Sequence, residues 1–117
     1  MPHDPEKYLY DVLDSCKFLL EFTAARTLDE YKQDRGFRSA VERELQIIGE
    51  ALWVLSRISP ELAQRISEHQ HIIHFRHHLV HGYDSLEHDI VWNVIVNKLS
   101  ILRNEIEMLL KELEAKT

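Results

Sequence analysis

Apolar residues recur every three or four positions along most of this chain, which is the period of an amphipathic helix rather than of a strand. The first predicted helix covers residues 5–26, where Asp4 and Pro5 form an N-cap and first-turn pair. Its apolar stripe consists of Tyr8, Leu9, Val12, Leu13, Cys16, Leu19 and Leu20. Because Cys16 has apolar neighbours on this stripe, we expect it to be a core residue.

Two helices are predicted to follow in the first half of the chain. The first begins after Thr27, which forms a capping box with Glu30, and it ends at Gly36. The next covers residues 37–57, and its main apolar stripe consists of Phe37, Val41, Leu45, Ile48, Leu52 and Leu55. Gly49 is unfavourable inside this helix, so we expect another backbone to approach closely there.

The second half of the chain contains a short connecting helix over residues 59–67, a histidine-rich helix that Gly82 ends, and a long last helix over residues 86–115 that Asp84 or Ser85 can cap. The last helix has coiled-coil spacing at Val91, Ile95, Leu99, Leu102, Ile106, Leu109 and Leu113. A continuous helix of this length spans roughly 40 Å, so we expect its end to meet a partner chain. The pattern predicts an all-α bundle with four main helices and short connecting helices, in a single domain over residues 1–117.

Composition narrows the class of protein. The chain has 117 residues with 44% hydrophobic content, and its 3 Gly and 3 Pro leave long uninterrupted helical runs. The formal net charge of -6 argues against broad, non-specific nucleic-acid binding but allows a local basic cleft. A single cysteine, without a signal-peptide pattern or a run of transmembrane length, predicts a cytoplasmic protein that does not enter a membrane.

The stretch over residues 69–83 holds six of the 8 histidines in the chain. On a helix, its apolar residues share one arc, and these are Ile72, Ile73, Phe75, Leu79 and Val80. The opposite arc carries His74, His77, His78 and His81. Arg76 and Tyr83 are seven positions apart and fall in the middle of the apolar arc.

Arg76 raises a physical problem, because a guanidinium stays charged and is costly to bury without a partner. Glu50, next to Gly49, is the carboxylate that we expect to meet it, although an exposed helix glutamate is an equally ordinary interpretation. On an ideal helix, Arg76 and His81 diverge by roughly 140°. Either Gly82 ends the helix and lets His81 turn, or a second copy of the chain completes the site.

Two kinds of chemistry suit these residues. A metal could bind the pairs His74 with His78 or His77 with His81, but no carboxylate lies in residues 69–80, and the chain has only one Glu-x-x-His pair instead of the two of a di-iron bundle. Metal-free RNA cleavage needs a base of near-neutral pKa and a fixed cation to stabilise charge on phosphate, which histidine and arginine supply. By itself, an arginine with a histidine five positions later is a weak signal.

The segment from Arg76 to Tyr83 resembles the Arg-x4-His-x-Tyr motif of the HEPN superfamily, in its HepT-like toxin branch. The upstream segment from Ile48 to Ala51, Ile-Gly-Glu-Ala, resembles a signature of the same branch. The likeness covers almost the whole chain. One departure is His77, which stands where the family usually has Asn or Asp.

The resemblance implies a homodimer with the two motifs facing each other across a cleft. It implies a metal-independent ribonuclease toxin that needs no cofactor and acts on RNA, with Arg76 and His81 as catalytic residues and with His77 and Glu50 in support. It also implies a cognate nucleotidyltransferase antitoxin of the MntA type, which adds AMP to Tyr83. The alternative is a non-catalytic HEPN-like binding partner of a nucleotidyltransferase, for which the negative net charge and His77 leave room.

Overall fold

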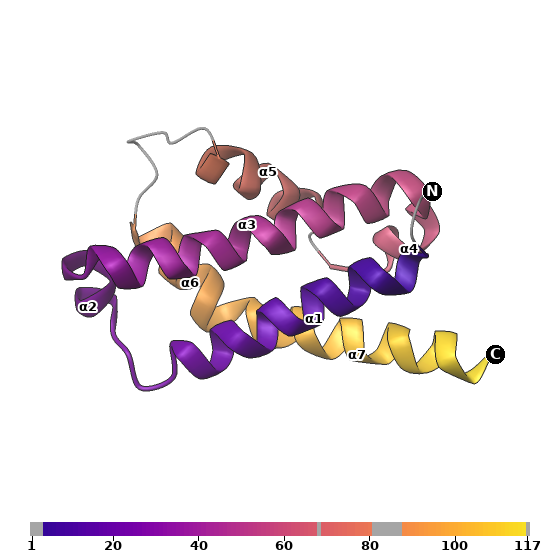
Figure 1. The fold of residues 1–117 in the computed structure, drawn as a ribbon, viewed down its shortest axis with the longest axis horizontal. Helices are drawn as coiled ribbons and strands as arrows, with labels where there is room; N and C mark the ends of the chain where they lie inside the picture. The colour runs from indigo at the N-terminus through magenta and orange to yellow at the C-terminus, as the bar shows by residue number, and fades with distance from the viewer. Residues whose placement is uncertain (1–3, 68, 81–87, 117) are drawn as a thin grey trace.

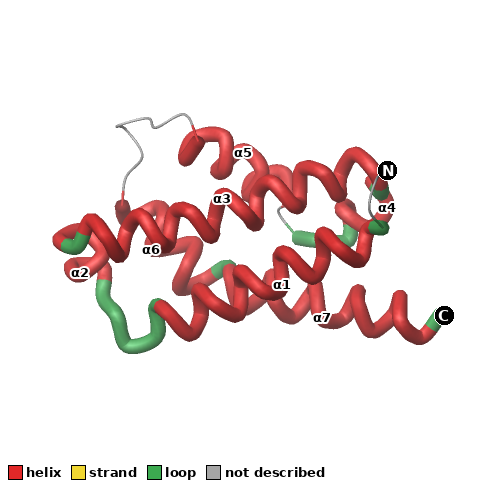
Figure 2. Tube along the Cα trace, in the orientation of Figure 1, coloured by secondary structure: helices red, strands yellow, loops and turns green. Residues whose placement is uncertain are grey.

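The described part of the chain consists of seven helices and contains no strand (Figure 2). The structure is a computed structural model that describes residues 4–67, 69–80 and 88–116, with only the backbone described for residues 78–80. The helices are α1 (Pro5–Phe22), α2 (Leu28–Gln33), α3 (Arg35–Ile58), α4 (Pro60–Gln64), α5 (His69–Val80), α6 (His88–Asn97) and α7 (Leu99–Ala115). The all-α prediction is confirmed for these residues. None of the helices within them is both long and apolar enough to cross a membrane.

α3 is the central element of the fold. It packs against α1 on one side and α5 on another, and α7 packs against α1 (Figure 1). Successive long helices run in opposite directions, so the start of α1 and the end of α7 lie at the same end of the molecule (Figure 1). This arrangement places the histidine-rich helix α5 along the outer side of α3.

The core forms where the apolar stripes of these helices meet. The main stripe of α3 is buried over its whole length, and so are Leu9, Val12, Cys16 and Leu19 of α1. Burial raises the pKa of the Cys16 thiol to about 12, so this side chain stays a neutral apolar group. The prediction of Cys16 as a core residue is confirmed.

α1 ends at Phe22 and not at Arg26 as predicted. The hydroxyl of Thr23 donates a hydrogen bond of 2.7 Å to the carbonyl of Leu19, and Ala25 has a φ of 63°. This left-handed conformation costs roughly 1–2 kcal/mol for a residue other than glycine. The turn contains neither glycine nor proline, so the sequence does not signal it.

The boundary between α2 and α3 also differs from the prediction. Thr27 caps α2 as expected, because its side chain accepts a hydrogen bond from the backbone N–H of Glu30. Gly36, however, does not end this helix. Asp34 accepts a hydrogen bond of 3.0 Å from the N–H of Phe37, which starts α3 before the glycine.

α4 ends at Gln64, three residues earlier than predicted. Ser67 donates hydrogen bonds from its backbone N–H and its hydroxyl to the carboxylate of Glu105 on α7. These bonds hold the chain against α7 in place of another helical turn.

The long last helix predicted over residues 86–115 is two helices, and residues 86 and 87 lie outside the described ranges. At Lys98 φ is -114°, which departs from helical geometry, although the N–H of Lys98 still reaches the carbonyl of Val94 at 3.0 Å. The kink lets α6 pack against α2 while α7 packs against α1. The predicted stripe is nevertheless buried on both sides of the kink, at Val91, Ile95, Leu99, Leu102, Ile106 and Leu109.

The end of α7 has neighbours within its own chain. Tyr10 of α1 donates a hydrogen bond to Glu114, and Arg65 forms an ion pair with Glu112. These contacts hold the end of α7 against α1 and the segment after α4, and the expected contact of this end with a partner chain stays a prediction.

Candidate active site around Arg76

Arg76 is held where α5 crosses α3 at Gly49. A Cβ atom added to Gly49 would lie 2.2 Å from the Cβ of Arg76 and 2.8 Å from its Cγ. No side chain fits in that space, so only glycine permits the contact. The close approach predicted at Gly49 is confirmed, but the group that approaches is the side-chain stem of Arg76 and not another backbone as expected.

The guanidinium of Arg76 lies beside the next residue of α3. Its Nη2 donates a hydrogen bond of 2.9 Å to Oε2 of Glu50, which confirms the expected carboxylate partner. The Arg76 side chain is 28% exposed and that of Glu50 is 61% exposed. An ion pair this open to solvent contributes only about 0–1 kcal/mol, so it orients the arginine without holding it strongly.

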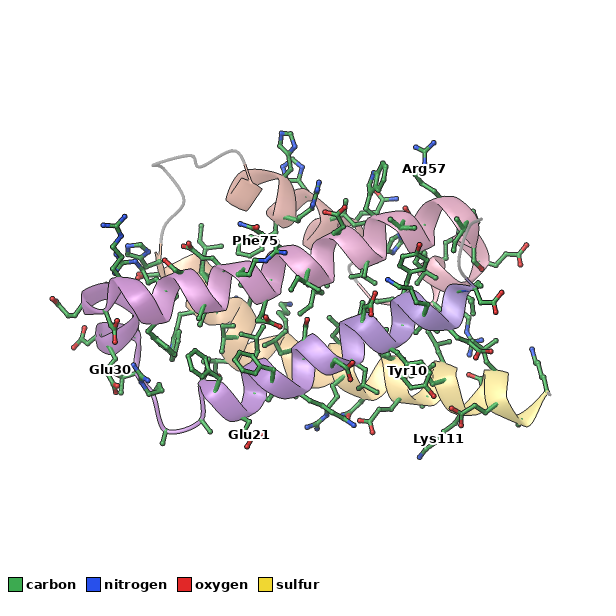
Figure 3. The ribbon with its side chains drawn as sticks, viewed as in Figure 1. Tyr10, Glu21, Glu30, Arg57, Phe75 and Lys111 are labelled. Carbon is green, nitrogen blue, oxygen red and sulfur yellow. The ribbon has the colours of Figure 1, made fainter. Side chains whose placement is uncertain are left out.

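Of the four histidines predicted on the exposed arc of α5, the structure describes the side chains of two. His74 and His77 are exposed, and their rings stack with centroids 6.5 Å apart. The apolar arc faces the core through Ile72, Ile73 and Phe75, which pack against buried residues. Figure 3 shows Phe75 between α5 and α3.

Several predicted site residues fall outside the described residues. His81, Gly82 and Tyr83 are among them, and the side chain of His78 is another. The expected end of the helix at Gly82 and the relative direction of Arg76 and His81 therefore stay predictions. Among the side chains that are described, no three of His, Cys, Asp or Glu come together as metal ligands.

An open hollow of about 540 Å³ lies between α3 and α5 beside Arg76. We call it the polar groove, and its lining includes Trp53, Ser56, Gln70, His74, Arg76 and His77. Sequence reasoning missed Trp53 as a site residue. The available signal was its position off the buried stripe of α3, on the same face as Glu50 and Arg57.

A second hollow lies on the opposite side of α5. It has a volume of about 220 Å³ and is mainly apolar, and we call it the apolar hollow. Ile72 and Phe75 of α5 line it together with Ile90 of α6 and Ile101 of α7. Ile90 and Ile101 are 49% and 51% exposed, so this side of the molecule presents an apolar surface.

The known proteins that this chain resembles are named as ribonucleases or putative ribonucleases. The profile of the family described as "Ribonuclease HepT-like" matches residues 12–109. A protein of Methanocaldococcus jannaschii named "Putative RNase" is 29% identical over 113 residues, which cover 95% of this chain and 91% of that protein. A "Probable ribonuclease HepT" of Thermococcus cleftensis is 26% identical over 115 residues, covering 95% of this chain and 100% of that protein. No solved structure matches this chain.

The close contact between Arg76 and Gly49 predicts that a methyl group added at position 49 lowers the stability of the fold. Gly49→Ala should lower the free energy of unfolding, because overpacking typically costs about 1–3 kcal/mol and the gain in helix propensity is at most about 1 kcal/mol. Urea unfolding followed by circular dichroism measures the change.

Gly36→Ala is the matched control in the same helix. A Cβ there would meet only Oδ1 of Asp34, at an ordinary distance of 3.5 Å, so stability should be unchanged or raised. Equal stability of the two variants would contradict the tight contact at Gly49.

Proposed function

Because this chain belongs to the family of HepT-like ribonucleases, we propose that it is a metal-independent endoribonuclease and the toxin of a toxin–antitoxin pair. The observation that carries the proposal is the placement of Arg76, which begins the Arg-x4-His-x-Tyr motif and is held on Gly49 beside Glu50. A cation with a constrained stem and a partly exposed side chain is suited to bind a phosphate.

In the proposed reaction, a 2′-hydroxyl of RNA attacks the neighbouring phosphorus atom and the bond from phosphorus to the 5′-oxygen breaks. One proton leaves the 2′-oxygen and another reaches the 5′-oxygen. His81 acts as the general base or acid, and Arg76 stabilises the negative charge that develops on the phosphoryl oxygens. Glu50 orients Arg76, and His77 supports the site from the next position of α5.

We further propose that the active protein is a two-fold homodimer with the two motifs facing one cleft. The divergence of roughly 140° between Arg76 and His81 on one ideal helix supports this arrangement. The apolar hollow supports it as well, because its exposed isoleucines join α5, α6 and α7 in one surface suited to another protein chain.

Regulation is proposed to act through Tyr83. Its phenolic oxygen can accept an adenylyl group from a nucleotidyltransferase antitoxin of the MntA type. Each AMP would add a negatively charged phosphodiester and a bulky base near Arg76, in the space that a scissile phosphate requires.

Loss of either catalytic side chain should abolish cleavage. Arg76→Ala and His81→Ala should each lower the rate of RNA cleavage at least about 100-fold, because each removes a group that acts in the transition state. Cleavage of labelled RNA and toxicity in cells measure the loss, and wild-type activity should survive excess EDTA.

Arg65→Ala is the control for the Arg76→Ala and His81→Ala variants. Arg65 is an exposed arginine that forms an ion pair with Glu112 away from the site. Its activity should equal that of wild type. Activity that chelation removes and zinc or manganese restores would contradict the metal-free mechanism.

The dimer predicts a mass in solution twice the 13.9 kDa of one chain at micromolar concentration. Ile101→Glu should shift the protein toward monomer, because it places a charge in the apolar surface. Phe18→Glu, at an exposed aromatic residue of α1 that does not line the apolar hollow, should leave the mass unchanged. A monomeric wild type in sedimentation equilibrium would refute the dimer.

Tyr83→Phe should give an active toxin that the antitoxin no longer neutralises by adenylylation, since only the hydroxyl is lost. Intact-mass measurement after incubation with the cognate nucleotidyltransferase and ATP should show added AMP on wild type and none on the variant. An unmodified wild type would contradict this role.

Stable binding to the nucleotidyltransferase without any RNA cleavage would favour the non-catalytic alternative.

A further inference from the structure

An exposed tryptophan lines the same groove as the candidate phosphate-binding arginine. Trp53 is 44% exposed, although it belongs to a residue type that is usually buried for most of its surface. It lies one helical turn after Gly49, the residue that contacts Arg76. The four residues from Gly49 to Trp53 rise about 6 Å along α3, a distance that a single nucleotide can span.

The chemistry around Trp53 is polar and cationic. The guanidinium of Arg57 lies over the indole ring, 5.1 Å from its centroid, and Arg57 points away from the bundle near the end of α3 (Figure 3). Besides Trp53 and Ile73, the described lining of the polar groove contains imidazole, amide, hydroxyl and guanidinium groups and no carboxylate, and the carboxylate that pairs with Arg76 belongs to Glu50 outside this lining. In a chain with a net charge of -6, this groove is therefore a local site where a polyanion can approach.

We propose that Trp53 is a stacking platform for one base of single-stranded RNA, adjacent to the phosphate that Arg76 binds. An indole ring stacks on any base, because every base has a π-face, and a neighbouring arginine adds a cation–π contact. The inference rests on the proposed function, because it assigns a base-binding subsite to the same groove. It makes the substrate single-stranded, since a base within a duplex cannot stack on a side chain.

A nucleobase suits this groove better than a protein side chain. A tryptophan that anchors a protein interface normally enters a well-packed, desolvated pocket, whereas Trp53 lines an open hollow in which most of the other lining side chains carry polar groups. The apolar surface of this chain lies on the other side of α5, at the apolar hollow. The polar groove therefore suits a nucleobase, and the apolar hollow suits another protein chain.

Fluorescence can test the stacking directly, because the chain has only 2 tryptophans. Trp92 packs against Tyr31 and Phe37, so Trp92→Phe preserves an aromatic contact and leaves Trp53 as the single emitter. The probe is a single-stranded RNA oligonucleotide with 2′-O-methyl groups, which binds but has no 2′-hydroxyl to react. We expect saturable quenching of Trp53 by this probe and little quenching by its duplex or by an abasic strand.

Affinity measurements on the full-length protein provide a second readout. In fluorescence anisotropy with the same probe, Trp53→Ala should weaken binding by about 5- to 100-fold, and Trp53→Phe should retain most of the affinity. With cleavable RNA, Trp53→Ala should raise KM more than it lowers kcat. The matched control is Phe18→Ala, because Phe18 is an aromatic residue of similar exposure, 45%, outside the groove.

Three results would overturn the stacking proposal. They are no binding of the probe, binding without quenching of Trp53, and a Trp53→Ala variant that becomes monomeric while its affinity for the probe is unchanged. The last result would assign Trp53 to the protein interface. Quenching that persists in a protein with no ribonuclease activity would refute the proposed cleavage and leave the base-binding subsite in place, so the two failures are distinguishable.

Discussion

Where α5 crosses α3, the stem of Arg76 lies on the backbone of Gly49 at a distance that leaves no room for a side chain. This contact determines how closely the two helices approach and where the guanidinium emerges from between them. It also brings Arg76 beside Glu50, the next residue on α3. A glycine that weakens the interior of its own helix thus positions the arginine of a neighbouring helix.

Different neighbours position the Arg76 side chain and neutralise its charge. Its stem is constrained by packing, which is insensitive to salt, whereas its head meets a largely exposed carboxylate in a weak ion pair. A tightly buried pair would resist exchange, because removing one partner would leave an uncompensated charge. An exposed pair can exchange Glu50 for a phosphate at little cost, and this property suits the transient RNA binding that we propose for Arg76.

The two sides of α5 have different chemistry. Toward the polar groove the helix presents mainly polar side chains, with Ile73 among them, and toward the apolar hollow it presents Ile72 and Phe75 together with His71. Between Ile72 and its neighbours Gln70 and His74, this difference follows from the helical period, which sends residues two positions apart to nearly opposite faces. One short helix can therefore serve both of the surfaces that we propose, with α3 as the support for the nucleic-acid surface and α6 and α7 as neighbours of the protein surface.

The sequence by itself determined the helical class, the buried stripes and the need for a carboxylate near Arg76, because these follow from periodicity and from the cost of an unpaired cation. It did not reveal the turn at Ala25 or the kink at Lys98, neither of which has a glycine or proline to mark it. Trp53 was also missed, because whether a tryptophan lies beside an arginine depends on which helix crosses its own. Only the tertiary structure decides such features: α6 and α7 pack against different helices, and α5 forms the polar groove by lying along α3 at Gly49.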